Sequence, residues 1–479
     1  MNKWFVLFFI IAGLALMVRL VSLEIRPMHT DEAVHAVKFG RLLEEGYYRY
    51  DKNEYHGPLL NYLTLIPAWF LSQKDLAGVN EYTLRVIPAI SGTGLVLLLL
   101  AVIRFLKSVT WIFSALFLGI SPVLVFYSRY YIQESLLVFF TWAALFFLYR
   151  WIESGNKKWA LLTGFTLGMT VATKETWIIA LGGILFSAMV LFFTGRKTGI
   201  FPMARALNLK NMGLMMLSAA IVWILFYSSF FSNLQGLTDS MATYANYIKK
   251  AGGFEKHIHP WYYYLQLLAY GRNGGWFWTE AFLLAAGSIG FIFALRNRND
   301  KEGIFFLFIA LFSIFTACVY SMLPYKTPWN LLTSYTGWIL LAGYGCAEVI
   351  RISRTKTSRY LICFLIFSGV IHLGYQTWFL NYEYYADASN PWVYGHTGRD
   401  IFRLVEKVED ISGTQPSGKD IHIEIIAAGH DYWPLPWYFR EYPNTGWWDH
   451  VDMVSPPAPV IIASPEFGTE LLEKIYEIP

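Results

Sequence analysis

The chain has 479 residues, of which 55% are hydrophobic, 18% aromatic and only 15% charged. Soluble globular domains carry roughly 25% charged residues, so this composition all but excludes a water-soluble globule. The apolar residues come in blocks of about 17–23, the length of helix needed to cross a hydrocarbon core of ~30 Å. We therefore expect a multi-pass membrane protein. The formal net charge of +4 gives no reason to expect a nucleic-acid partner, and we expect none.

The apolar blocks predict about eleven transmembrane helices. They cover residues 4–23, 84–105, 111–126, 136–151, 159–172, 177–193, 212–231, 276–295, 304–322, 331–350 and 360–380. The block at 159–172 is short, and residues 58–71 read as a re-entrant or interfacial segment, so the count stays open by one or two. The first block contains Arg19 and no small-residue cleavage site follows it, which favours a retained anchor over a signal peptide.

The positive charges give this arrangement an orientation. With the blocks placed as above, seventeen Lys and Arg residues fall in short connections on one face: Lys3, Arg104, Lys107, Arg150, Lys157, Lys158, Arg196, Lys197, Arg205, Lys210, Arg296, Arg298, Lys301, Arg351, Arg354, Lys356 and Arg359. Short cytoplasmic loops are enriched in such residues, so the N-terminus is expected in the cytoplasm. With an odd number of spans, the C-terminus is expected outside.

Three longer pieces then lie on the outer face, namely residues 24–83, residues 232–275 and a tail from residue 381 onward. The tail has the pattern of a soluble domain, with helical spacing at 399–411 and 467–476 and strand-like runs at 421–427 and 460–463. The predicted fold is therefore mainly α, a polytopic transmembrane domain over residues 1–380. A small extracytoplasmic α/β domain follows over residues 381–479.

The first chemical motif, MHTDEA at residues 28–33, directly follows the first predicted span. If Thr30 is an N-cap, Asp31 and Glu32 lie in the first helical turn, where carboxylates interact favourably with the helix dipole. This reading explains both acids without any function. Two adjacent carboxylates at the outer membrane surface are also candidate catalytic groups, and both readings stay open at this point.

A second motif, SRYYIQES at residues 128–135, occupies a short outer connection between two spans. Arg129 and Tyr130 are typical of a membrane-interface belt, in which rings and cations lie at headgroup level. Gln133 and Glu134 stand at the start of the next span. A carboxylate so close to hydrocarbon is costly unless it is paired or functional, which makes Glu134 a candidate site residue.

Cations interrupt apolar sequence at two further outer connections. In ATKET at residues 172–176, Lys174 and Glu175 either satisfy each other within a turn or serve a ligand. In PYKTPW at residues 324–329, Lys326 is a single cation between two prolines. Charges this close to spans are expensive, so each is a candidate for binding an anion.

The last motif is HIHPWYYYL at residues 257–265, with Arg272 shortly after it. His257 and His259 are weak indicators of zinc, because no third ligand is spaced to join them. Trp261 and Tyr262 belong to an aromatic run that fits an interfacial helix or a platform for a sugar. All five motifs lie on the outer face, where cations would hold a phosphate and a carboxylate would accept the proton of an attacking hydroxyl.

In order and topology these motifs resemble the GT-C superfamily of integral membrane glycosyltransferases, among them protein O-mannosyltransferases and the enzyme that adds aminoarabinose to lipid A. Asp31 and Glu32 match the acidic motif after the first span, and Gln133 and Glu134 match the second acidic site. Residues 172–174 resemble a Lys-containing turn of those families, and residues 257–263 a His…Pro-Trp-Tyr element. The whole chain is most similar to a prokaryotic family of flippase-activity-associated proteins.

The resemblance implies a cell-envelope glycosyltransferase that moves a sugar, with inversion, from a polyprenyl-phosphate donor to a hydroxyl of a glycolipid, glycan or protein. It implies Asp31 as the base, with Glu32 and Glu134 orienting the acceptor or sharing that role. The candidates for binding substrate are Arg129, Tyr130, Gln133, Lys174, Glu175, His257, His259, Trp261, Tyr262, Arg272 and Lys326, of which Arg129, Lys174, Arg272 and Lys326 would hold the phosphate.

No cofactor is expected to be required, because the mannosyltransferase-like branch works without a metal. Gln133 also stands where metal-using oligosaccharyltransferases keep an acid, although the resemblance leaves a divalent metal open. The flippase-associated name leaves an alternative function, a lipid-linked sugar flippase component or a non-catalytic partner of one. Such a protein would need cations and rings near the membrane but no base beside an outer cavity.

Overall fold

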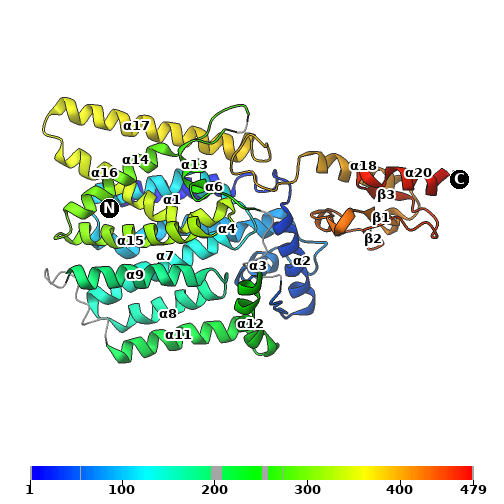
Figure 1. Cartoon of the computed structure of the whole chain (residues 1–479), viewed down its shortest axis with the longest axis horizontal. Coiled ribbons are helices and arrows are strands. Elements are labelled where there is room, and N and C mark those ends of the chain that lie inside the picture. The colour runs from blue at the N-terminus through cyan, green and yellow to red at the C-terminus, as the bar shows by residue number, and fades with distance from the viewer. Residues whose placement is uncertain (1–2, 54–55, 196–207, 251–256, 273, 477–479) are drawn as a thin grey trace.

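The computed structural model of the chain describes residues 3–53, 56–195, 208–250, 257–272 and 274–476 (Figure 1). Long helices lie side by side in a bundle, and a smaller tail that contains a sheet lies beyond one end of it (Figure 1). The predicted mainly α fold is confirmed. Of the predicted cytoplasmic cations, Arg196, Lys197 and Arg205 lie outside the described residues.

The bundle and its connections contain the following helices in chain order: α1 Lys3–Leu20, α2 Thr30–Glu45, α3 Leu59–Phe70, α4 Glu81–Val102, α5 Ser108–Ile120, α6 Pro122–Tyr127, α7 Glu134–Ser154, α8 Lys157–Val171, α9 Trp177–Gly195, α11 Leu209–Tyr227, α12 Gln235–Lys250, α13 Tyr263–Ala269, α14 Ala281–Arg296, α15 Lys301–Met322, α16 Leu332–Ile352 and α17 Lys356–Trp378. Each of the eleven predicted blocks contains one of these helices. The block at 111–126 is divided, since α5 ends at Ile120 and α6 begins at Pro122.

Six helical stretches of the described chain are long and apolar enough to cross a membrane: Lys3–Leu20, Glu81–Phe105, Glu134–Ser154, Leu209–Tyr227, Lys301–Met322 and Lys356–Glu383. Shorter apolar helices are α3, α5, α14 and the stretch Trp177–Phe193 of α9. Helices α8 and α16 are the other two that coincide with predicted blocks. The count of about eleven spans stays a prediction.

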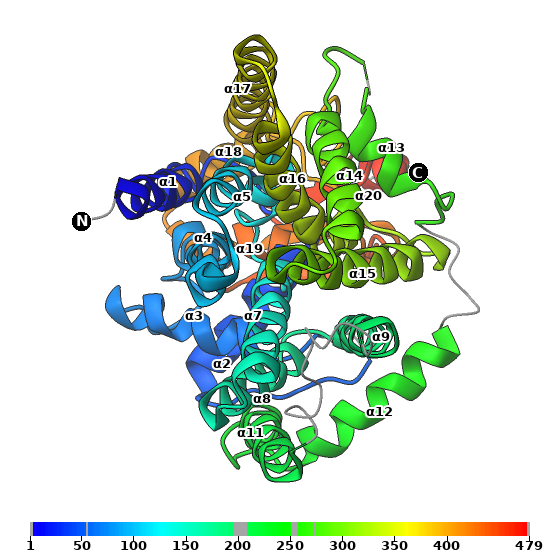
Figure 2. The same ribbon diagram turned by 90° about the vertical axis from the view of Figure 1, so that its left-hand side faces the viewer.

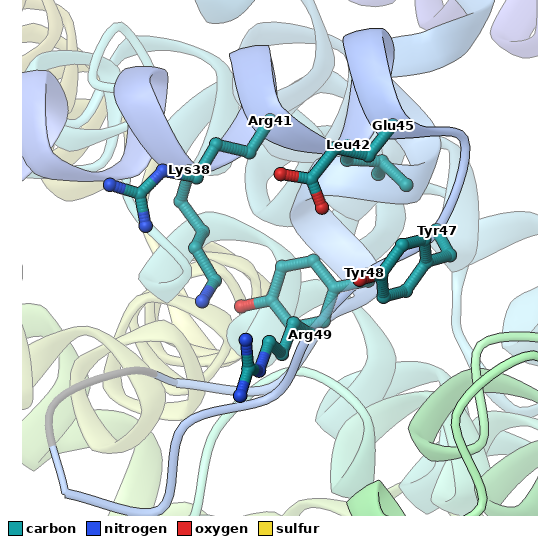
Figure 3. Close-up of a pocket in the computed structure, with 7 residues that line it drawn as sticks. All are labelled: Lys38, Arg41, Leu42, Glu45, Tyr47, Tyr48 and Arg49. Atoms are coloured by element: carbon teal, nitrogen blue, oxygen red, sulfur yellow. The ribbon is translucent and has the colours of Figure 1, made fainter.

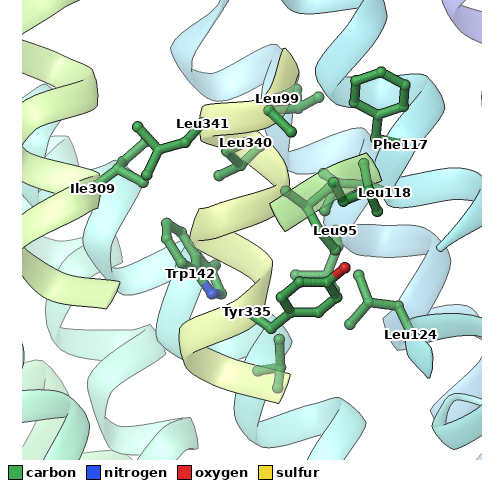
Figure 4. Close-up of a cluster of buried hydrophobic side chains, with 14 of the residues drawn as sticks. Leu95, Leu99, Phe117, Leu118, Leu124, Trp142, Ile309, Tyr335, Leu340 and Leu341 are labelled. Carbon is green, nitrogen blue, oxygen red and sulfur yellow. The ribbon is translucent and has the colours of Figure 1, made fainter. Parts of the chain in front are cut away.

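Helix α16 lies in the middle of the bundle and contacts α5, α7, α14 and α15 (Figure 2). Its crossing with α14 is close because both helices carry glycine there. A Cβ atom on Gly290 would lie 1.9 Å from the carbonyl oxygen of Leu341, so no other residue fits at that position. Around α16, apolar side chains from α4, α5, α7 and α15 fill the core, with Trp142 and Tyr335 among the largest (Figure 4).

The tail folds as the sequence pattern predicts, with one strand more. It contains α18 Asp400–Thr414, β1 Ile423–Ile426, α19 Leu435–Tyr438, β2 Thr445–Trp448, β3 Val460–Ala463 and α20 Gly468–Tyr476. The three strands form a parallel sheet in the order β2-β1-β3, with Ile423 opposite Thr445 and Val460. Strand β2 has the sequence TGWW, in which apolar and polar residues do not alternate, so the sequence pattern did not predict it.

One end of the bundle gathers the long connections. Figure 1 shows α2, α3, α12 and the tail at the end opposite the N-terminus. The tail is fastened there by hydrogen bonds: the Tyr438 hydroxyl accepts from the backbone N–H of Met28 at 2.9 Å, and Trp437 Nε1 donates to Glu81 at 2.9 Å. The segment that precedes α2 therefore lies under the tail.

Candidate active site

The acidic motif begins helix α2 in a reciprocal cap. His29 is the N-cap residue: its Nδ1 accepts the backbone N–H of Asp31 at 3.0 Å, and Glu32 accepts the backbone N–H of His29 at 3.0 Å. The prediction of Thr30 as N-cap was wrong by one residue, because the imidazole of His29 takes the capping bond. Asp31 is left with 48% of its side chain exposed, in the first turn of α2.

Glu32 points the other way and is fully buried. Its carboxylate receives Nε and Nη2 of Arg85, both at 2.8 Å, and the backbone N–H of Tyr131 at 2.8 Å. Burial alone would raise the pKa of Glu32, but the charges of Arg85 and Arg26 and these hydrogen bonds lower it to about 2. This carboxylate therefore fixes the start of α2 to α4 and to the 128–135 motif, and it does not face an open site.

The second and third motifs meet in an ion pair. Glu134, the first residue of α7, is paired with Lys174, which lies in the connection between α8 and α9. Both side chains are buried. The alternative in which Lys174 and Glu175 satisfy each other within a turn is therefore not what the structure shows. Each residue pairs with a partner far away in the sequence.

Glu175 pairs with His56, whose Nδ1 lies 2.8 Å from Glu175 Oε2, and it accepts the Tyr50 hydroxyl at 3.2 Å. Burial acts to raise the pKa of Glu175, but the charge of His56 and its hydrogen bond lower it below the ordinary value. The close approach depends on Gly57. A Cβ atom there would lie 2.2 Å from the carbonyl oxygen of Ala172, so only glycine brings these two segments together.

His35 lies between the acidic motif and these pairs. It stands one helical turn after Asp31 on α2 and is buried. Burial first, and then the positive charges of His56 and Lys174, lower its pKa to about 3 against the opposing charge of Asp31. Gln133 Nε2 lies 3.4 Å from its Nδ1. His35 is thus neutral, and the charges of Asp31 and Lys174 both reach it.

Tyr325, in the connection between α15 and α16, lies near the same charged groups. Burial raises the pKa of its hydroxyl, on which the charges of Lys174, Asp31 and Glu134 also act. Lys326 beside it is buried, and its ammonium donates to the carbonyl oxygens of His259, at 2.8 Å, and of Leu323. Lys326 therefore holds two outer connections together and presents little charge to a ligand.

The two histidines of the fourth motif converge on Tyr394, a residue of the tail. His257 Nδ1 and His259 Nε2 lie 2.5 Å and 3.1 Å from the Tyr394 hydroxyl. The carbonyl oxygen of Tyr394 lies 3.1 Å from Nε2 of His29, which donates because its Nδ1 accepts the cap bond. Tyr394 thus connects the 257–265 segment to the acidic motif. No motif in the sequence predicts this contact.

Arg129 and Tyr130 are used inside the fold. The Arg129 guanidinium donates to the carbonyl oxygens of Val21, at 2.7 Å, and Ser22, at 2.8 Å, and so caps the C-terminal end of α1. The Tyr130 ring is fully buried beneath Arg26, whose guanidinium carbon is 3.3 Å from the ring centroid. Neither side chain is available to a ligand without breaking these contacts.

The remaining candidates are more open. Trp261 is 70% exposed and Tyr262 is also exposed, as expected for side chains at a membrane interface. Arg272 is exposed and has no ion pair within the part of the chain that the structure describes. The described residues likewise contain no group of three or more His, Cys, Asp or Glu side chains arranged around a common metal position.

Comparison with known proteins bears on this arrangement. Residues 14–238, which contain the acidic motif, Glu134 and Lys174, match the family model of dolichyl-phosphate-mannose-protein mannosyltransferase. Among solved structures, ArnT from Cupriavidus metallidurans bound to undecaprenyl phosphate matches with a TM-score of 0.64 and 14% identity, over 98% of this chain and 91% of that one. No curated protein sequence matches significantly.

Two further structures have the same fold. The S. cerevisiae protein O-mannosyltransferase complex bound to the sugar donor matches with a TM-score of 0.61 and 11% identity, over 85% of this chain and 92% of that one. The Archaeoglobus fulgidus oligosaccharyltransferase tethered with an acceptor peptide matches with a TM-score of 0.58 and 13% identity, over 97% of this chain and 64% of that one. At 11–14% identity these structures show that the chain shares their fold.

Sequence patterns missed four residues that build the site. Arg85 is a charge at the very start of an apolar block, which is a recognisable signal of a functional or paired group. His35 lies four residues after Asp31, so helical spacing could have placed it on the same face. His56 precedes the Gly-Pro of the outer loop and has no periodic pattern around it, and Tyr394 has none either.

Proposed function

We propose that the chain transfers a sugar from a polyprenyl-phosphate donor to an acceptor hydroxyl, at the end of the bundle where α2 and the tail meet. A GT-C fold and the mannosyltransferase family match over residues 14–238 support this reaction class. Within the chain, one observation carries it: Asp31 is a half-exposed carboxylate whose charge reaches His35 together with those of Lys174 and His56, the cations of the pairs with Glu134 and Glu175.

The proposed chemistry is a single displacement. The oxygen of the acceptor hydroxyl attacks the anomeric carbon, the bond from that carbon to the phosphate oxygen breaks, and the configuration is inverted. The polyprenyl phosphate leaves as a stable anion, so no general acid is needed. Asp31 accepts the proton of the attacking hydroxyl because, of the two adjacent carboxylates, it is the one that a substrate can reach.

Lys174 is the proposed partner of the donor phosphate. Its pairing with Glu134 fixes the position of the buried ammonium before the substrate arrives. The cation-rich connections at the opposite end of the bundle support a site outside the cytoplasm. We therefore propose that the N-terminus is cytoplasmic and that residues 381–479 form an extracytoplasmic domain.

The test is transfer by purified protein with a panel of polyprenyl-phosphate sugars, scored by release of the free polyprenyl phosphate. Asp31→Asn should reduce this release by at least about a hundred-fold, the usual contribution of a general base, while donor binding is kept. Asp400→Asn is a matched control. Asp400 is also an exposed acid in the first turn of a helix, α18, but it lies in the tail.

Full turnover in Asp31→Asn would refute the assignment of the base. Wild-type protein that binds the donor lipid but releases no polyprenyl phosphate with any sugar would instead favour the flippase-associated function. An equal loss in Asp400→Asn would show that the effect is a general consequence of altering surface charge. The three outcomes are distinguishable in one set of measurements.

A further inference from the structure

A hollow of about 510 Å³ lies beside α2, about two helical turns after Asp31. Its lining residues come from the second half of α2 and from the chain that follows it: Lys38, Arg41, Leu42, Glu45, Tyr47, Tyr48 and Arg49. Figure 3 shows the ends of the Lys38 and Arg49 side chains turned toward the Tyr48 hydroxyl. None of these residues belongs to the site described above.

The hollow is a basic one. Three cations line it against a single carboxylate, that of Glu45. An adjoining hollow shares Lys38, Arg41 and Arg49 and adds Lys52 and two acids, where Lys52 already pairs with Asp239 at 3.2 Å. Neither the Arg41 nor the Arg49 guanidinium forms an ion pair with any of the described residues.

Two features separate this hollow from an ordinary solvated surface. Lys38 is only 7% exposed and its ammonium lies 5.2 Å from the centroid of the buried Tyr48 ring, which forms a fixed wall. Burial, ahead of the neighbouring charges, lowers the pKa of Lys38 to about 8, and an anion bound beside it would raise that pKa again. Planar guanidinium groups next to it can bind a phosphate through paired N–H donors.

The hollow is connected to the candidate active site. Lys38 follows Asp31 by seven residues on one helix, which is about 10 Å along the axis. Tyr50, which lines the adjoining hollow, donates its hydroxyl to Glu175 of the His56–Glu175 pair. One layer of side chains therefore separates the basic hollow from the groups proposed to act on the donor.

We propose that the hollow of Lys38, Arg41 and Arg49 binds a phosphate group of the acceptor, about 10 Å from the hydroxyl that is glycosylated. This inference rests on the proposed function, since it names a class of acceptor for the same site. It selects acceptors that carry a phosphate some two or three sugar or lipid-backbone units from the reacting hydroxyl. Neutral acceptors would lack this contact.

The first experiment measures binding alone. Wild-type protein in nanodiscs of phosphatidylcholine is titrated with inorganic pyrophosphate by calorimetry. The double variant Arg41→Gln/Arg49→Gln should bind about ten-fold more weakly, since two exposed charge contacts are lost. Both side chains are exposed, so folding should be kept. The control Arg403→Gln/Lys407→Gln removes two exposed cations from α18 and should bind like the wild type.

Pyrophosphate affinity that is equal in the wild type and the Arg41→Gln/Arg49→Gln variant would overturn the proposal. A second arm adds phosphatidylglycerol to the nanodiscs. If anionic headgroups then abolish pyrophosphate binding to the wild type, the hollow serves the bilayer and the assignment to the acceptor is wrong.

The third arm measures transfer. The double variant should raise the KM for a phosphate-bearing acceptor by about ten-fold and leave release of polyprenyl phosphate without acceptor unchanged. An unchanged acceptor KM would overturn the proposal, whereas wild-type protein that binds pyrophosphate but never releases polyprenyl phosphate would refute the proposed function instead.

Discussion

Replacing Glu32 by Gln tests whether the second acid of the motif anchors the site or takes part in the chemistry. In the structure its carboxylate accepts two bonds from Arg85 and one each from the backbone of His29 and Tyr131. Gln keeps the shape and part of the accepting capacity. It removes the charge and turns an NH2 group toward the buried guanidinium of Arg85, which is left without a counter-charge.

Two routes give the size of the effect. The pKa of Glu32 is lowered from 4.5 to about 2, and 1.36 kcal/mol per unit makes its ionised form worth about 3 kcal/mol to the folded state. Removal of one partner from a buried ion pair typically costs 3–5 kcal/mol. We therefore expect Glu32→Gln to destabilise the protein by about 3 kcal/mol, and to lower turnover because Asp31 is displaced with the start of α2.

The assay pairs thermal unfolding, followed by tryptophan fluorescence of detergent-purified protein, with turnover per folded molecule. Glu406→Gln, an exposed acid on α18, serves as control and should change neither quantity. A variant Glu32→Gln that is as stable as the wild type would refute the anchoring role. If that stable variant also lost turnover, Glu32 would have to contact the substrate directly, as its place beside Asp31 in the sequence suggests.

The remaining predictions concern pH, the two cations and the tail. Because the folded-state pKa of Glu32 is depressed, its stabilisation is fully present above pH 4.5 and is lost as the pH falls toward 2; unfolding midpoints measured against pH should show this loss, and Glu32→Gln should lack it. Arg129→Met should cost about 3 kcal/mol by uncapping α1 but leave the donor KM unchanged, and a raised KM at unchanged stability would return Arg129 to the phosphate site. Lys174→Met should destabilise by about 3 kcal/mol, because Glu134 stays buried without its ion-pair partner, and should also raise the donor KM; unchanged donor binding would contradict its proposed role. Tyr394→Phe should weaken the hold on His257 and His259 and raise the acceptor KM more than the donor KM, which initial rates with each substrate varied in turn would measure.

The helices of the bundle could be predicted because most carry an apolar block of their own, and a helix lies at each predicted block, with the 111–126 block divided between α5 and α6. What the blocks could not predict is how the helices pack. The crossing of α14 and α16 depends on Gly290 meeting a carbonyl group of the facing helix, and nothing local to either helix reveals its partner. Strand β2 was not predicted for a similar reason, since its pairing with β1 defines it and no local pattern does.

The candidate site could be predicted as a set of segments, because a charge beside hydrocarbon is rare enough to stand out. The ion-pair partners of its charged residues could not be predicted. Lys174 and Glu175 are neighbours of opposite charge, and a local turn is the obvious reading of the sequence. In the fold they face different partners, Glu134 and His56, because Gly57 brings the 56–58 segment against the carbonyl of Ala172. Such a contact is invisible without tertiary structure.

The scarcity of charge identifies which charges matter but not what they do, and the atoms that each charge contacts make that distinction. Arg129 and Lys326 donate their hydrogen bonds to backbone carbonyl groups. Such bonds cap a helix end or hold two loops together. Lys174 meets a side chain that a ligand can displace or join, and Asp31 faces solvent. Among charges that are equally conspicuous in the sequence, the second kind can take up a ligand without a helix end or loop junction coming apart. For that reason we assign the proposed chemistry to Asp31 and Lys174 and the architecture to Glu32, Arg129 and Lys326.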